Sequence, residues 1–579
     1  MTTTLTEHNH RLPGSTQLDL PHVTVLVDRC AGCQECVVRC PTAALSMDTS
    51  AWVVLADDQA CVGCRQCERT CPFSAIQVTG PVLAGSRVGT QIHHPVPLDG
   101  DTHEVRLGLD SPDAALAEAQ RCLACPDPTC VRGCPAHNDI PGFIAAIADG
   151  DLDRAHRVLR TTTMLPDVCS RVCDQAVQCE GACSWSLAGA RPVAIGLLER
   201  YVTDTAPVPG PQVPAAAAGP DGSAGPDIGI IGSGPAGIAA AWELVEAGAR
   251  VTVYERDDQP GGLLRWGIPD FTLPAAVASR PWEQLSAAGV ELRCGTEISP
   301  GDLDDLRARH DGLVLAYGAV APMRLPVSGA DLPGVWDATS FLVAAHAALG
   351  AGRPLAALAA VPHGGQTRPA QVLVVGAGNT AMDVARSTRR LGAHAVCVDW
   401  MDPRFAPVRP DELAEAQEEG VDIRFQTTVS ELTEADAGRI CATLRATRQD
   451  RADRLPHVVD GAPTELEADL VVMAMGYRVD PAMAAAAPGT PLRASAPDFP
   501  DRRWIASGLR PELTPSFARH LPVGRLALVR EARLDAAAQA RQPGVYLAGD
   551  GLVGPSTVVE AMAQGRRAAH HLLADLAGR

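Results

Sequence analysis

The segment from Asp227 to Glu255 constrains the fold more than any other stretch of the chain. Its sequence, DIGIIGSGPAGIAAAWELVEAGARVTVYE, has a short apolar strand, a glycine turn, an alanine-rich helix and a second strand that ends on an acid. This order predicts the first βαβ unit of a dinucleotide-binding domain, with phosphates at the N-terminus of the helix and the acid on the ribose. The predicted contacts are Gly232, Gly234, Pro235, Ala236, Gly237 and Glu255.

Two later stretches favour FAD as the occupant of this site. Residues 260–269 are PGGLLRWGIP, and residues 544–551 are GVYLAGDG, a further strand that ends in Gly-Asp. The order of motifs resembles that of flavoproteins with two dinucleotide domains, in which the late Gly-Asp places its carboxylate on the ribityl chain. The helix that follows would direct its positive end toward the flavin. The resemblance implies contacts from Gly262, Leu263, Arg265, Gly549, Asp550 and Thr557.

A second glycine turn, of the form G-x-G-x-x-A, follows the apolar strand 372–375 and precedes a helix and a strand, 395–398. This unit predicts a nicotinamide nucleotide site. Asp399 ends the second strand, where an acid suits the free 2′-hydroxyl of NADH and repels the 2′-phosphate of NADPH; a turn acid is the alternative. NADH is therefore favoured, although Arg404 and Arg409 leave NADPH open. The predicted contacts are Gly376, Gly378, Asn379, Thr380, Ala381, Asp399 and Gly476.

Sixteen of the nineteen cysteines lie before residue 184, in tight groups that indicate metal rather than disulfides. Residues 30–41 and 61–72 share the spacing C-x2-C-x2-C-x3-C-P, typical of a bacterial ferredoxin with two [4Fe–4S] clusters, in which the fourth cysteine binds the other cluster. The alternative, zinc, usually takes two separated pairs of cysteines. The predicted ligand sets are Cys30, Cys33, Cys36 and Cys71 for one cluster, and Cys61, Cys64, Cys67 and Cys40 for the other.

The other grouped cysteines lie in segments that resemble a known family. RCLACPDPTCVRGCPAHNDIPGF, TTTMLPDVCSRVCDQAVQCEGAC and PVAIGLLERY are similar to the N-terminal domain of the glutamate synthase small subunit and of dihydropyrimidine dehydrogenase. The similarity continues to the C-terminus, over roughly 470 residues. The resemblance implies one [4Fe–4S] cluster on Cys122, Cys125, Cys130 and Cys183. It implies another on Cys134, Cys173, Cys179 and the side-chain oxygen of Glu199, which is otherwise a helix-surface acid. Cys169 is left over, either as a thiol near the cluster or as a substitute ligand.

Together the motifs predict a multidomain α+β and α/β chain. It contains a ferredoxin-like domain, an α-helical Fe–S domain and two Rossmann-like domains, the FAD domain being split by an inserted NAD(P) domain. Aperiodic or Pro/Ala/Gly-rich segments are predicted linkers. The predicted boundaries are a polar tail 1–21, ferredoxin domain 22–80, linker 81–110, helical Fe–S domain 111–204, linker 205–226, FAD domain 227–345 and 476–579, and NAD(P) domain 346–475.

Composition narrows the functions further. The net charge of −19 disfavours a nucleic-acid partner, and no apolar run approaches the roughly 20 residues of a membrane span. The polar N-terminus lacks the layout of a signal peptide, so we expect a cytoplasmic protein. The chain has no lysine, which excludes pyridoxal phosphate and P-loop chemistry. The scattered Cys294, Cys397 and Cys441 form no C-x-x-C for disulfide reduction.

These observations predict an NAD(P)H-dependent iron–sulfur flavoprotein that passes electrons between a nicotinamide nucleotide, FAD and four [4Fe–4S] clusters, to or from a protein such as ferredoxin or a partner reductase. This chemistry needs positioning and tuned potentials, so no catalytic acid, base or nucleophile is predicted. One alternative is the electron-input small subunit of a glutamate synthase, with a large catalytic partner. Another is an Fe–S relay or redox sensor without turnover of its own. Dihydropyrimidine reduction is disfavoured because the motifs leave no room for a substrate barrel.

Overall fold

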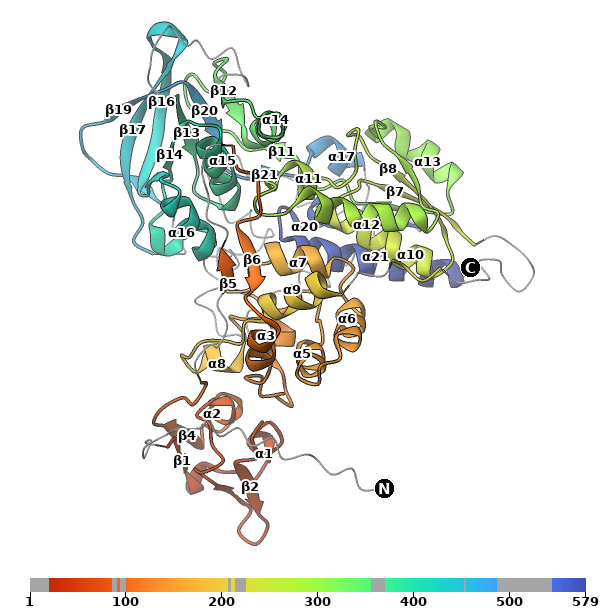
Figure 1. The fold of residues 1–579 in the computed structure, drawn as a ribbon, viewed down its shortest axis with the longest axis vertical. Helices are drawn as coiled ribbons and strands as arrows, with labels where there is room; N and C mark the ends of the chain where they lie inside the picture. The colour runs from red at the N-terminus through yellow and green to blue at the C-terminus, as the bar shows by residue number, and fades with distance from the viewer. Residues whose placement is uncertain are drawn as a thin grey trace.

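The computed structural model describes residues 20–85, 91–93, 100–206, 210–213, 225–355, 370–451, 455–486 and 544–578. Most of the predicted polar tail, most of the linker 205–226 and much of the segment 476–579 lie outside these residues. An N-terminal unit lies at one end of the molecule, a helical unit lies in the middle, and two parallel sheets lie at the other end (Figure 1). Within the described part of the chain, no helix combines the length and hydropathy that a bilayer crossing requires.

The N-terminal unit, residues 20–85, consists of two similar halves. Strand β1 (His22–Val25) pairs antiparallel with β4 (Ile76–Thr79), and β2 (Leu45–Asp48) pairs with β3 (Val53–Ala56). Each half contributes a short helix, α1 (Glu35–Val38) or α2 (Gln66–Thr70), inside its run of cysteines. The close spacing of cysteines therefore forms a compact turn in each half.

The helical unit, residues 100–206, contains one strand, β6 (Arg106–Leu109), which pairs with the preceding strand β5 (Gln91–His93). The prediction of a plain linker over 81–110 is therefore wrong in its second half. Gly100 N donates to Arg390 O and Val105 N to Phe271 O, each at 2.9 Å, so this segment is held by tertiary contacts that its local sequence does not reveal. The helices are α3 (Pro112–Ala119), α4 (Thr129–Gly133), α5 (Ile140–Ala148), α6 (Leu152–Arg160), α7 (Pro166–Val172), α8 (Ser184–Leu187) and α9 (Ile195–Thr205).

The first parallel sheet has the strand order β22-β10-β7-β8-β9, and we call it, with its helices, the split sheet domain. Its last strand comes from the far end of the chain, since Leu313 lies beside Val545. Helices α10 and α21 pack closely, because a Cβ on Gly565 would lie 2.0 Å from Ala236 O. The elements are β7 (Asp227–Ile231), α10 (Pro235–Glu246), β8 (Arg250–Tyr254), α11 (Leu263–Trp266), α12 (Ala275–Ala287), β9 (Glu291–Arg293), α13 (Leu303–Arg309), β10 (Gly312–Leu315), β22 (Val545–Leu547), α20 (Asp550–Val553) and α21 (Val558–Ala577).

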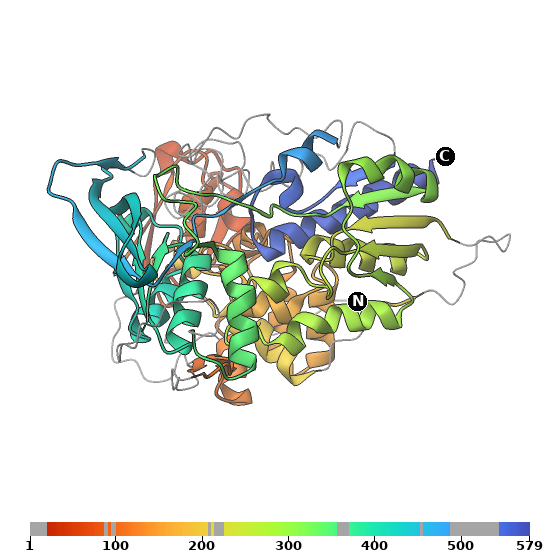
Figure 2. The ribbon, with the colours of Figure 1, turned by 90° about the horizontal axis from the view of Figure 1, so that it is seen from above.

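The second parallel sheet, in the inserted sheet domain, has the order β12-β20-β13-β14-β15 and carries an antiparallel layer. Figure 2 shows the two sheet domains side by side. The elements are β12 (Val335–Asp337), α14 (Ala338–Gly350), β13 (Gln371–Val375), α15 (Asn379–Arg390), β14 (His394–Val398), α16 (Pro410–Glu418), β15 (Asp422–Arg424), β16 (Thr427–Glu434), β17 (Ile440–Arg448), β18 (His457–Val458), β19 (Thr464–Ala468) and β20 (Leu470–Met473).

The predicted boundary at residue 345 is wrong. Strand β12 pairs with β20, and α14 packs on α15, so both belong to the inserted sheet domain. The chain crosses between the domains earlier, at β11 (Ala321–Pro322), which pairs with the returning strand β21 (Tyr477–Arg478). The sequence conceals this crossing because β12 is three half-buried residues long and has no apolar run.

Candidate functional site

The eight cysteines of the N-terminal unit fall into two sets. Burial, followed by the charges of Cys71, Cys33 and Cys30, raises the pKa of Cys36 to about 11. In the other set, burial raises the pKa of Cys67 to about 12, with further contributions from the charges of Cys64, Cys40 and Cys61. Each set thus includes the last cysteine of the other run, as a pair of ferredoxin clusters would need. Ligation itself stays a prediction.

A third set of thiols surrounds one cavity of the helical unit. Cys122, Cys125, Cys130 and Cys183 line this cavity, with Ile144 and Trp185 among its apolar neighbours. Burial raises the pKa of Cys125 to about 12. Burial raises the pKa of all four thiols, which suits a site in which bound iron stabilises the thiolates.

A fourth set combines thiols with a carboxyl group. Burial raises the pKa of Cys134, and the charges of Cys173 and Glu199 contribute to the shift. Burial also raises the pKa of Cys179, with contributions from the charges of Cys134, Cys173 and Glu199. Burial raises the pKa of Glu199 to about 8. Cys169 belongs to the same group, because its thiol hydrogen-bonds with that of Cys173. The structure therefore brings both the predicted oxygen ligand and the leftover cysteine to the three thiols, and the fourth ligand stays a prediction.

These groups of thiols fit an iron–sulfur cluster better than a single metal ion. Among the described side chains, no three His, Cys, Asp or Glu residues are grouped so that they could hold a metal ion. A [4Fe–4S] cluster is held by four thiolates, one for each iron, and so needs four thiols about a shared volume. The third set, which lines one cavity, fits this requirement best.

The four sets follow one another through the molecule. Gln66, two residues after Cys64, donates from Nε2 to Asp127 O, two residues after Cys125, at 3.0 Å, and this bond joins the N-terminal and helical units. At the other end of the helical unit, Gln178 Nε2 donates to Thr557 Oγ1 at 3.4 Å and so meets the start of α21. Gln178 precedes Cys179 of the fourth set. The units that carry the thiol sets are thus in contact from the N-terminal unit through the helical unit to the split sheet domain.

The first glycine turn leaves space where a nucleotide would bind. Gly232 has a φ of +101°, and a Cβ there would lie 2.3 Å from Ala316 O. A Cβ on Gly237 would lie 2.1 Å from Gly232 O, whereas one on Gly234 would meet nothing within 4 Å. The turn is therefore closed against its own sheet and open at its middle glycine, as a pyrophosphate site requires. Pro235 and Ala236 begin α10 directly behind it.

Glu255 supports this turn in a way the sequence did not predict. Ser233 N donates to Glu255 Oε2 at 3.0 Å, and the Ser233 hydroxyl donates to the same oxygen. Gly261 N donates in turn to Ser233 Oγ at 2.9 Å. A Cβ on Gly262 would lie 3.1 Å from Gly234 Cα, so the loop 260–262 packs on the turn. The contact of Glu255 with a ribose stays a prediction.

Unpaired polar atoms lie near the predicted flavin contacts. Among the described residues, the buried Tyr317 hydroxyl and the buried Arg265 Nε have no hydrogen-bond partner. The Tyr317 ring is 3.1 Å from where a Cβ on Gly551 would lie, next to the Gly-Asp segment. Such atoms suit the polar edge of a bound cofactor. Tyr317 was missed because a lone tyrosine after a strand has no recognisable pattern.

The other predicted contacts of this site surround the same region. Gly549 has a φ of +69°, and Asp550 accepts from Ser556 Oγ at 2.5 Å. Thr557 caps the 20-residue helix α21 through a reciprocal pair of bonds with Glu560. The positive end of α21 therefore lies at the predicted flavin site. Leu263 begins α11 beside Gly262.

The second glycine turn repeats the first. Gly376 has a φ of +121°, and a Cβ there would lie 2.3 Å from Ala474 O. For Gly378 the nearest atom is Pro407 Cγ at 4.0 Å, so its middle glycine is open as well. Asp399, 4% exposed, accepts from Ala377 N at 2.9 Å. This region also fits a dinucleotide.

The residues around the second turn are partly engaged. Asn379 Oδ1 accepts from Arg409 N at 2.8 Å. The two arginines that left NADPH open are already ion-paired, Arg404 with Asp402 and Arg409 with Asp411. The remaining predicted contacts are Thr380 and Ala381, in the first turn of α15, and Gly476, at the crossing between the sheet domains.

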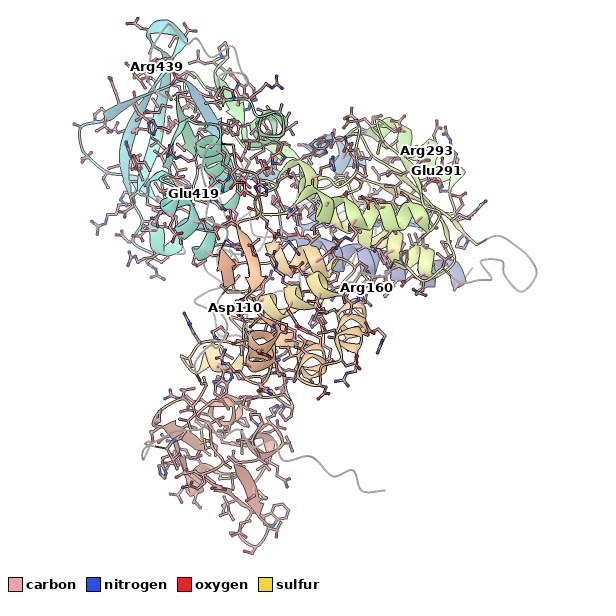
Figure 3. All side chains as sticks on the ribbon, viewed as in Figure 1. Asp110, Arg160, Glu291, Arg293, Glu419 and Arg439 are labelled. Atoms are coloured by element: carbon pink, nitrogen blue, oxygen red, sulfur yellow. The ribbon has the colours of Figure 1, made fainter. Side chains whose placement is uncertain are left out.

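A charged network fixes the inserted sheet domain against its neighbours. Arg106 of β6 contacts Glu415 at 2.5 Å and Asp411 at 3.0 Å. Arg386, 1% exposed, bonds to Glu419 at 2.9 Å, and its guanidinium lies 4.7 Å from the ring centre of Phe271 in the split sheet domain. Glu419, labelled in Figure 3, is the C-cap residue that ends α16. Sequence reasoning missed these residues because their contacts depend on the folded chain, and Arg106 and Phe271 contribute from other domains.

Three family models match the chain. A 4Fe-4S dicluster domain matches residues 29–75, dihydropyrimidine dehydrogenase domain II, 4Fe-4S cluster, matches residues 99–209, and pyridine nucleotide-disulphide oxidoreductase matches residues 226–495. The resemblance that the cysteine segments predicted is confirmed. The chain therefore has 4Fe–4S domains followed by FAD/NAD(P)-binding domains built on Rossmann-like parallel sheets.

Several curated proteins are similar over most of the chain. The putative oxidoreductase UacF of Escherichia coli (strain K12) is 32% identical over 480 residues, which are 81% of this chain and 69% of that protein. The glutamate synthase (NADPH) small chain of the same organism is 32% identical over 476 residues, 79% of this chain and 91% of that protein. The corresponding small chain of Mycobacterium tuberculosis (strain ATCC 25618 / H37Rv) is 33% identical over 492 residues, with 82% and 91% covered.

Proposed function

The chain belongs to the family of the glutamate synthase small chain and is an iron–sulfur flavoprotein oxidoreductase; on that premise we propose that it passes electrons between a nicotinamide nucleotide and a protein acceptor, through FAD and four [4Fe–4S] clusters. The observation that carries the proposal is the succession of thiol sets. Gln66 and Asp127 join the N-terminal and helical units beside Cys64 and Cys125, and Gln178 meets Thr557 at the split sheet domain.

The residues of the chain bind and position the groups. When bound, FAD takes an electron pair from the nicotinamide, and the clusters carry electrons one at a time. Gly234 leaves space for the flavin pyrophosphate, and α21 directs its positive end to the flavin, where it stabilises negative charge. Gly378 leaves the matching space for the nicotinamide nucleotide in the inserted sheet domain, which divides the FAD domain in two.

The exit for electrons is the first cluster of the N-terminal unit. Among the cysteines of the described chain, Cys33 of this set is the one with an exposed side chain. Large apolar side chains near other cysteines of this set are also exposed, Val27 at 60%, three residues before Cys30, and Phe73 at 48%, two residues after Cys71. Exposure of a ligand and of apolar surface at the end of the path supports exchange with a protein partner.

NADH is the preferred nucleotide. Asp399 is buried at the end of β14, and both nearby arginines, Arg404 and Arg409, are ion-paired. A buried carboxylate repels a 2′-phosphate. Arginines that are already ion-paired offset this repulsion less than unpaired arginines would.

The test is the anaerobically purified protein. We expect one flavin and about sixteen iron atoms per chain, with NADH bleaching the flavin and cluster absorbance and supporting reduction of a viologen dye. Cys64→Ser should lose about four iron atoms, keep the bleaching of flavin by NADH, and lose reduction of the protein acceptor. Cys294→Ser, a control outside the four sets, should change none of these. Bound zinc in place of iron, or no response to either nicotinamide nucleotide, would overturn the proposal; the latter would leave a relay or sensor.

A second candidate is the small subunit of a glutamate synthase. It is favoured by relatives of that name that are matched over 91% of their length. Co-purification with a large, glutamate-forming subunit would select it over a ferredoxin-type acceptor.

A further inference from the structure

A buried serine lies at the contact between the N-terminal and helical units. Ser184, the first residue of α8, is 4% exposed, and its Oγ lies 3.3 Å from Cys125 Sγ. The same oxygen lies 3.5 Å from Oε1 of Gln66, a residue of α2 that is 3% exposed. Gln66 Nε2 donates to Asp127 O at 3.0 Å, which fixes the amide so that its oxygen faces Ser184. One hydroxyl thus lies between a thiol of the helical unit and an amide of the N-terminal unit.

The hydroxyl has one proton and two acceptors. A thiolate ligand has no proton to donate, so when Cys125 binds iron Ser184 donates either to Cys125 Sγ or to Gln66 Oε1. A bond to a charged acceptor is stronger than one to a neutral amide. Additional negative charge on the sulfur therefore draws the proton toward Cys125, while Gln66 competes for it.

We propose that Ser184 and Gln66 together set the reduction potential of the cluster site formed by Cys122, Cys125, Cys130 and Cys183. Hydrogen bonds to cluster sulfurs are among the factors that set such potentials. Ser184 raises the potential by donating to Cys125, and Gln66 lowers it by competing for the same proton. This inference rests on the proposed function and adds two residues that position a proton at a ligand sulfur.

The reduction potential of the cluster site in the helical unit is linked to the contact of this unit with the N-terminal unit. Gln66 belongs to the N-terminal unit and lies two residues after Cys64 of the second thiol set. Arg39 of the same unit also bonds to the Asp127 carboxylate at 3.0 Å. Contact between the units therefore places the competing acceptor beside Ser184.

The experiment is a redox titration of the full, cluster-loaded protein followed by electron paramagnetic resonance, with dithionite as the reductant. Ser184→Ala should move one midpoint potential to a more negative value. Gln66→Met, which is similar in size, should move the same potential to a more positive value. Ser184→Thr, which keeps the hydroxyl, should restore the wild-type value. Ser186→Ala, on the same helix, is the matched control and should leave all potentials unchanged.

The signs of the shifts decide the proposal. Unchanged potentials in Ser184→Ala and Gln66→Met, or shifts in the same direction, would overturn it. If Ser184→Ala fails to retain iron, the other two variants decide the proposal. It then requires a more positive potential in Gln66→Met and the wild-type value in Ser184→Thr. Opposite shifts in a protein whose flavin NADH does not reduce would support this inference and overturn the proposed function, so the two can fail separately.

Discussion

Glu255 and Asp399 occupy equivalent positions in the two parallel sheets. Each ends the second strand of its βαβ unit, and each accepts a hydrogen bond from the amide that follows the first glycine of its turn. The donors are Ser233 N at 3.0 Å and Ala377 N at 2.9 Å. The two predicted nucleotide sites therefore have the same local structure, and in both the acid stabilises the glycine turn.

Asp399→Asn removes the charge of this acid and keeps one oxygen that can accept from Ala377 N. The amide keeps an oxygen acceptor but no longer repels a 2′-phosphate. We expect the ratio of kcat/KM for NADPH to that for NADH to rise about tenfold, equivalent to about 1.4 kcal/mol. Viologen reduction with both nucleotides measures it. Asp422→Asn, at an exposed pair with Arg424, is the control. An unchanged ratio would assign Asp399 to the turn alone.

Gly237→Ala and Gly234→Ala should affect folding and flavin binding separately. A Cβ at Gly237 would lie 2.1 Å from Gly232 O. We expect this variant to lose about 1–3 kcal/mol of unfolding free energy even without cofactor.

At Gly234 a Cβ meets nothing within 4 Å, so the apoprotein should unfold as the wild type does. The methyl group would occupy the space of the pyrophosphate, and flavin affinity should fall by about tenfold or more. Thermal unfolding of the apoprotein and fluorescence titration with FAD measure the two effects. Equal flavin affinity in Gly234→Ala and wild type would contradict the assignment.

Glu199→Ala and Cys169→Ser identify the fourth ligand of the fourth thiol set. If the carboxylate binds iron, Glu199→Ala should lose about four iron atoms. Glu199→Gln should retain them through its amide oxygen, and Cys169→Ser should be neutral. The reverse result, loss of iron in Cys169→Ser alone, would make the leftover thiol the ligand. Iron analysis of anaerobically purified variants measures this.

Arg106→Met should loosen the inserted sheet domain. It removes the cation that contacts Glu415 and Asp411 in a mostly buried network. Removal of one partner from such a network costs about 3–5 kcal/mol, because the acids remain without their counter-ion. Urea unfolding measures the loss. Arg404→Met, at a pair in which Arg404 is 67% exposed, is the control and should cost about 1 kcal/mol or less.

The parts that could be predicted from the sequence depend on local spacing. The glycine turns and the cysteine runs each fit within about thirty residues, and β7, α10 and β8 lie where the pattern predicts them. Strand β12 could not be predicted, because three half-buried residues become a strand only through pairing with β20.

The supporting residues of the site are equally hidden in the sequence. Ser184 and Gln66 are 118 residues apart, and each is a variable position beside a cysteine. Ser233 is a variable position of the glycine turn, and its bonds to Glu255 and Gly261 depend on the folded loop. Ligand types could be predicted, whereas the groups that orient them depend on tertiary contacts.

The pairing of Leu313 with Val545 has a consequence for the order of biosynthesis. Strand β22 leaves the ribosome after the iron–sulfur segments and after the whole inserted sheet domain. Because chains emerge from the N-terminus, the earlier segments can fold while the last strand is still being translated. The iron–sulfur segments can thus fold first, and the split sheet is complete only after β22 has been translated.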